Sequence, residues 1–235
     1  MFIALTGLLL GLALGVRHAF EPDHLAAVST LMVDGRGGAR GALLGAFWGV
    51  GHTVSLLLVG LVLALLGAQL PERLADLFEL GVAFMLLGLG ARALWRALRL
   101  GSEGEQRPHL HGKDQHLHAG QSDHLHLWRW TLARRPLLVG LVHGLAGSGA
   151  LTALAFATLP TLPARLLYIA LFGLGSIAGM SLLSGLAGLP LSRLGRSPRF
   201  LRALTATTGA VSTVLGLVWG YPIAGRLLSL QGLGS

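Results

Sequence analysis

The sequence predicts an all-α polytopic membrane protein with six transmembrane helices, arranged as an inverted 3+3 repeat with a discontinuous first helix. Of its 235 residues, 53% are hydrophobic and 12% are charged, whereas a soluble domain carries about 25% charged residues. Several apolar runs reach about 20 residues, the length that crosses a bilayer. The 35 glycines fit this class, because small residues let helices approach closely in lipid.

The apolar runs place the six spans and divide the chain. The expected spans are roughly 2–32, 41–68, 75–99, 136–158, 163–190 and 203–228. The first span is too long for one untilted helix, which indicates a kink or an interruption. We expect a single transmembrane domain over 1–235, with repeat 1 at about 1–100, a flexible His-rich loop at 101–135 and repeat 2 at about 136–230.

The basic residues predict the orientation. The net charge is +8, but the charges cluster in loops between apolar spans, which excludes a nucleic-acid partner. The loops after spans one, three and five hold most of the 18 Lys and Arg residues. By the positive-inside rule, both termini lie outside and the 101–135 loop is cytoplasmic, in a bacterial-type plasma membrane.

The two halves resemble each other in three short alignments. Leu14–His18 aligns with Val139–His143, and Gly49–His52 with Gly173–Ser176; the glycines of the third spans also align. An odd number of spans per copy inverts the second copy, which is typical of transporters with a substrate site near the midplane. Because residues 124–235 contain no Asp or Glu, we expect the first half to supply the charge that balances a cation.

The stretch Arg17–His24 places five ionisable residues within the first span. Ionisable groups at membrane depth are costly and mark a functional site. On an unbroken helix His18 and His24 would lie about 120° apart. Pro22 should open the helix, free the His18 carbonyl and let His18, Asp23 and His24 converge. The alternative is a proline kink whose polar groups satisfy one another.

Within this stretch and its neighbours, several residues are expected to support the site. Arg17 could pair with Glu21 or Asp23, and we expect Glu21 and Asp23 to be the acids inside the spans. His52, followed by Thr53, lies in the second span; His143 and Ser148 are the polar contribution of the second half. A histidine bonded to a helix carbonyl would explain His52 or His143 equally well.

Six of the ten histidines lie in the central loop. They are His109, His111, His116, His118, His124 and His126. Such tracts indicate metal binding by composition, and the surrounding polar residues predict flexibility. We interpret the loop as a transient metal reservoir, with a plain polar linker as the alternative.

The residue types narrow the chemistry. The chain has no cysteine, which excludes disulfides and thiolate metal sites. Imidazole and carboxylate together suit Ni, Co, Zn, Cu(II) or Fe(II), and spacing alone does not choose among them. No protease, P-loop or nucleophile motif is present, so we expect neither an enzyme nor a permanent cofactor.

These motifs resemble the nickel/cobalt transporter (NiCoT) superfamily. Its signature, His, four residues and Asp-His after an Arg, stands here as Arg17-His18 and Asp23-His24, and its Gly-His-Ser/Thr motif as Gly51–Thr53. The segment Val142–Ser148 and the His-rich loop are similar to the shorter six-span UreH-type permeases. An acidic second-half motif of the longer permeases is absent, and His143 with a Gly/Ser segment stands in its place.

The resemblance implies transport of Ni²⁺, or Co²⁺, for the maturation of urease or hydrogenase, with nickel metallochaperones or accessory proteins as partners. The residues that it implies as metal ligands are His18, Asp23, His24, His52 and His143. Two alternatives stay open: an efflux protein for the same metals, and a non-transporting accessory protein that docks maturation factors through the loop. A membrane di-metal enzyme is disfavoured, because the repeated histidines lack acidic partners.

Overall fold

The computed structural model describes residues 2–32, 37–102, 130–159, 161–194 and 197–231. These residues form seven helices, and none of them lies in a strand. The helices are α1 (Phe2–His18), α2 (Pro22–Met32), α3 (Gly38–Leu66), α4 (Glu72–Ser102), α5 (Trp130–Thr158), α6 (Leu162–Leu194) and α7 (Pro198–Gln231).

The helices correspond to the predicted spans, with the first span divided. The expected interruption is present, because α1 ends at His18 and α2 begins at Pro22. Four helices, α3, α4, α6 and α7, are long and apolar enough to cross a membrane. The length of α5 is similar, but its first turns carry Arg134 and Arg135 and its seventh residue is Pro136, where we had placed the edge of the span.

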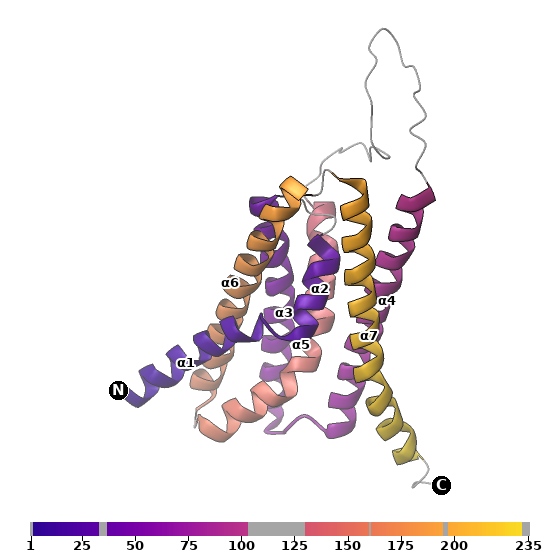
Figure 1. Cartoon of the computed structure of the whole chain (residues 1–235). Helices are drawn as coiled ribbons and strands as arrows, with labels where there is room; N and C mark the ends of the chain where they lie inside the picture. The colour runs from indigo at the N-terminus through magenta and orange to yellow at the C-terminus, as the bar shows by residue number, and fades with distance from the viewer. Residues whose placement is uncertain (1, 33–36, 103–129, 160, 195–196, 232–235) are drawn as a thin grey trace.

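Successive helices from α3 to α7 run in alternating directions through the bundle (Figure 1). In this view α1 begins and α7 ends near the lower edge, whereas α4 ends and α5 begins at the upper edge. α2 continues upward from the inner end of α1, which meets the bundle at an angle. α2, α4 and α6 therefore end at the edge where α3, α5 and α7 begin.

Glycines bring the central helices into backbone contact. α3 and α6 run antiparallel, since Gly38 lies against Leu189 and Gly173 against Thr53. Across the interface between α3 and α5, Gly51 lies against the Leu137 carbonyl, without room for a Cβ atom. Serine hydroxyls add hydrogen bonds between helices: Ser55 Oγ donates to the Leu141 carbonyl at 2.6 Å, and Ser176 and Ser212 make similar bonds. Close backbones and hydroxyl bonds are how helices associate in lipid.

The outer surface of the bundle is apolar. Leu58, Phe84, Leu182 and Val214 are all more than half exposed. In a soluble protein a surface this apolar would be a site of aggregation. Facing lipid, these side chains need no further partner.

We expect Gly51→Ala to destabilise the protein, because its methyl group would overlap the α5 backbone at Leu137. Overpacking of this kind costs about 1–3 kcal/mol. The matched control is Gly88→Ala on α4, where nothing lies within 4 Å of the added atom. Thermal unfolding in detergent should show a lower Tm for Gly51→Ala and an unchanged or raised Tm for Gly88→Ala. Equal Tm values for the two variants would contradict this packing.

Candidate metal centre

The break between α1 and α2 is a tight turn over residues 19–21. The Phe20 amide donates to the Arg17 carbonyl at 2.9 Å, and the Glu21 amide donates to the His18 carbonyl at 3.0 Å. Pro22 then opens α2, where its missing amide hydrogen costs nothing. The expected free carbonyl at His18 was therefore wrong, because the turn itself satisfies it.

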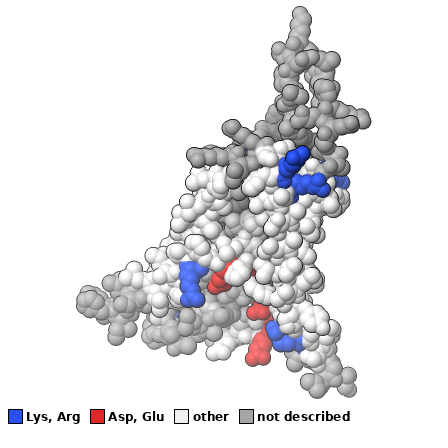
Figure 2. Space-filling model, in the orientation of Figure 1, with Lys and Arg blue, Asp and Glu red and all other residues white. Residues whose placement is uncertain are grey.

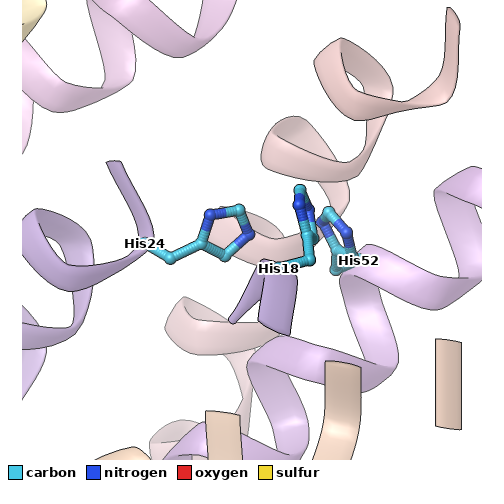
Figure 3. Close-up of side chains that lie close together, drawn as sticks. All are labelled: His18, His24 and His52. Atoms are coloured by element: carbon cyan, nitrogen blue, oxygen red, sulfur yellow. The ribbon is translucent and has the colours of Figure 1, made fainter. Parts of the chain in front are cut away.

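Three histidines from three helices converge beside this turn (Figure 3). His18 ends α1, His24 lies in the first turn of α2, and His52 lies in the middle of α3. The ring centres of His18 and His24 are 4.4 Å apart, and those of His18 and His52 are 5.1 Å apart. Each ring offers a nitrogen within 4.8 Å of the others, so the three can contact one ion.

Asp23 connects two of the histidines across the bundle. The His24 Nδ1–H donates to Asp23 Oδ1 at 3.0 Å, and the His143 Nε2–H of α5 donates to Asp23 Oδ2 at 2.6 Å. All three residues are buried. Asp23, His24 and His143 also form a second group with metal-binding spacing, and His24 belongs to both groups.

The carboxylates decide which nitrogens remain free. A carboxylate only accepts hydrogen bonds, so each nitrogen that faces one carries the proton. His18 Nδ1 donates to Glu21 Oε2 at 2.9 Å, as His24 Nδ1 does to Asp23. In the neutral form of each ring, Nε2 then carries the lone pair, and it has no partner among the described residues. Both nitrogens of His52 also lack a partner there, and one of them carries the lone pair in the neutral ring.

Unpartnered buried nitrogens are costly, at about 1–3 kcal/mol each. Here each of the three rings has at least one such nitrogen, and the rings bring one nitrogen each to within 4.8 Å of the others. Gly147 of α5 leaves room beside them, since a Cβ atom there would lie 3.7 Å from His18 Nε2. A cation bound between the rings would satisfy these nitrogens together, and carboxylate-oriented imidazole is a common arrangement around protein-bound metals.

The other residues expected at the site lie around it. Arg17 is exposed, and among the described residues it takes part in no ion pair; Glu21 and Asp23 pair with histidines instead. The Thr53 hydroxyl turns to α6, donating to the Gly49 and Gly173 carbonyls. Ser148 is part of α5, but its side chain lies outside the description.

The six histidines expected to capture metal in the loop lie outside the described residues. They are His109, His111, His116, His118, His124 and His126.

A pocket of about 380 Å³ leads to the histidines from the face where α7 ends. His18, Asp23 and His143 lie at its inner side, and Glu79 of α4 and Arg226 of α7 also line it. Arg226 donates to Asp76 at 2.6 Å. A hydrated divalent ion needs roughly 180 Å³ for six waters at about 30 Å³ each, so the pocket is large enough to admit one.

Two residues of this region were missed by the sequence analysis. Asp76 and Glu79 lie on α4, so the expectation that Glu21 and Asp23 are the acids inside the spans was wrong. Their i,i+3 spacing on one helix face was the available signal. The acids on this side are visible together in the lower half of the molecule (Figure 2). Trp48 stacks on His24, and the sequence pattern did not single it out.

The chain is similar to known proteins. The chain is 34% identical over 163 residues to the urease accessory protein UreH of Bacillus sp. (strain TB-90), covering 69% of this chain and 67% of that protein. It is 36% identical over 91 residues to the high-affinity nickel transport protein of Cupriavidus necator, covering 37% and 24% of the two chains.

A plant protein is also similar. The chloroplast protein FOR GROWTH AND FERTILITY 2 of Arabidopsis thaliana is 30% identical over 159 residues, which cover 67% of this chain and 40% of that protein. The chain thus spans less than half of two of these three relatives. No solved structure matches it at a significant level.

Residues 4–193 match the model of the NicO family, described as high-affinity nickel-transport protein. The match covers every residue of the histidine centre. This family consists of transporters and not of enzymes, and with four apolar helices of membrane-crossing length the chain is a multi-pass membrane protein. The expected nickel permease is confirmed at the level of the family, and the chain belongs to the NicO family of nickel-transport proteins.

Proposed function

We propose that this protein carries Ni²⁺ across the membrane through the buried histidine centre. The observation that carries the proposal is the convergence of unpartnered nitrogens from His18, His24 and His52 at one point. Ni²⁺ accepts imidazole and carboxylate ligands, and the centre offers both. Co²⁺ has similar preferences, so we include it as a second cargo.

The two ligand groups have different roles in this proposal. His18, His24 and His52 receive the ion first, because their free nitrogens need no bond to be broken. Asp23 and His143 are bonded to each other at 2.6 Å, and they reach the ion only when that bond opens. His24 is common to both groups, so the ion could pass between them without leaving it.

We also propose that the fold is an inverted 3+3 repeat, with α1 and α2 together matching α5, α3 matching α6, and α4 matching α7. The glycine contacts support it. Gly15 of α1 lies against the backbone of Phe172 in α6, and Gly140 of α5 lies against the backbone of Trp48 in α3. Gly175 of α6 in turn lies on α1 as Gly51 of α3 lies on α5. In each pair of contacts, matching residues of the two halves differ in number by the same offset as in the sequence alignment.

The direction of transport is proposed as uptake. The positive-inside rule puts the start of α1 and the end of α7 outside, and the pocket opens on that face. The delivered nickel would supply urease or hydrogenase maturation, with nickel metallochaperones or accessory proteins as receivers; the name of the UreH relative supports the urease route. An exporter of the same fold would instead move nickel from the cytoplasmic side to the outside.

Loss of the Asp23 charge should disable transport. In reconstituted vesicles we expect Asp23→Asn to lower ⁶³Ni²⁺ uptake at limiting concentration at least tenfold, because the centre loses its buried negative charge and the acceptor that orients His24. Glu21→Gln is the matched control, since Glu21 is about half exposed and bonds only His18. Glu21→Gln should lower uptake much less than Asp23→Asn does. Normal uptake by Asp23→Asn would contradict the site.

Nickel should stabilise the folded protein through His24. Ligand at 100 times Kd adds about 2.7 kcal/mol to the free energy of unfolding, so the Tm in detergent should rise with added Ni²⁺. His24→Ala removes the residue common to both ligand groups, and its Tm should not respond. The control Arg17→Gln changes an exposed side chain beside the site and should keep the full response. A response in His24→Ala equal to that of the parent chain would refute the assignment.

The loop histidines are proposed to capture metal at low concentration. Deleting residues 102–127 should leave uptake at saturating Ni²⁺ unchanged and reduce it at nanomolar Ni²⁺, since only the local ion concentration falls. Replacing the same segment with a Gly/Ser linker of equal length controls for tether length. If transport is unaffected at every concentration while urease activation is lost, the loop docks a maturation partner instead.

A further inference from the structure

We propose that Trp48 and Phe172 are positioning residues, two aromatic rings that clamp the histidines of the ion site from opposite sides. The inference rests on the proposed ion site and adds to it what holds the ligand rings in place. Neither residue can bind a metal through a lone pair, and neither lines the pocket that leads to the site.

Trp48 covers the histidine that both ligand groups share. Its indole stacks on the His24 ring, with centres 5.3 Å apart and planes 26° apart. Its edge also meets His143, at 5.8 Å and 66°. Trp48 is only 1% exposed, so the indole cannot swing away without moving the core around it. His24 and His143 are therefore both held against Asp23 by one side chain.

Phe172 packs in the same way against His18. Its ring centre lies 5.2 Å from that of His18, with the planes at 47°, and it is also buried. Within the proposed repeat Phe172 holds the position of Trp48, and His18 holds the position of His143. Each half thus supplies one aromatic ring that contacts a histidine of the other half.

The two rings reach the site from opposite directions. Trp48 precedes His52 by four residues on α3, and Phe172 precedes Ser176 by four residues on α6. Because α3 and α6 are antiparallel, one turn back along each helix leads to opposite ends of the bundle. The pocket opens near the start of α4 and the end of α7, so Trp48 lies on the side away from it.

Packing alone fixes the indole. Trp48 Nε1 has no hydrogen-bond partner among the described residues, so the shape of the ring determines its position. Gly140 makes room for it, since a Cβ atom there would lie 2.7 Å from Trp48 Cδ1. Another aromatic ring should therefore replace Trp48, and a branched aliphatic side chain should leave His24 free to rotate.

The test is Ni²⁺ affinity of the purified full chain in detergent, measured by isothermal titration for Trp48→Phe, Trp48→Leu, Phe172→Tyr and Phe172→Leu. Loss of a group that orients a metal ligand typically weakens metal affinity 10- to 100-fold. We expect both leucine variants to raise Kd by about this factor and both aromatic variants to stay within about threefold of the parent chain. The leucine effects should combine less than additively, since both act on one cluster.

Met180→Ala is the matched control for packing. Met180 is fully buried in the same apolar cluster as Trp48 and makes no ring contact with a histidine. It should lower the Tm while Kd stays unchanged. If Trp48→Leu remains monodisperse and binds Ni²⁺ as the parent does, or if Phe fails to rescue Trp48, the clamp is wrong. Failure of the ion site itself has a separate signature: the parent chain would bind no Ni²⁺, or His24→Ala would bind it equally well.

Discussion

The two hydrogen bonds that Asp23 accepts from histidines are the constraint on which the centre depends. The Asp23 carboxylate accepts hydrogen bonds from His24 on α2 and His143 on α5, in surroundings that leave it only 7% exposed. A buried carboxylate without such partners costs several kcal/mol. The two bonds therefore fix how α2 meets α5, and they also decide that His24 presents its Nε2 lone pair to His18 and His52. Asp23 therefore determines both the contact between α2 and α5 and the orientation of the His24 ring.

Asp23 can reach across only because α5 passes the other helices so closely. Gly140, Gly144 and Gly147 repeat along one face of α5, and the first two lie against the backbone around Trp48 and His52. Side chains at Gly140 and Gly144 would overlap the backbone of α3 and hold α5 away from it, and His143 would lose Asp23. The glycines that read as packing residues in the sequence are thus also what makes the site compact.

Much of this was predictable from the sequence, because the relevant signals are local. Pro22 in an apolar run predicts a broken helix, and the break predicts that His18 and His24 meet. Contacts between distant segments were not predictable in the same way. Nothing in the sequence indicates that the Thr53 hydroxyl turns to Gly173, or that Trp48 stacks on His24, since both depend on how α3 packs. Glu79 was overlooked because its helix reads as a plain span, and only the fold brings it to the pocket.

The absence of thiolate from this chain agrees with what a permease requires of its site. Binding must be favourable enough for the ion to enter and weak enough for it to leave. In the proposed site, three imidazoles would hold a divalent ion less strongly than thiolates do, and the nearest buried carboxylate is already engaged by two histidines. In the proposed mechanism, an ion that recruits Asp23 breaks the 2.6 Å bond to His143, and that bond re-forms when the ion departs. The hydrogen bond would then compete with the ion for the same oxygen, which would limit affinity and favour release.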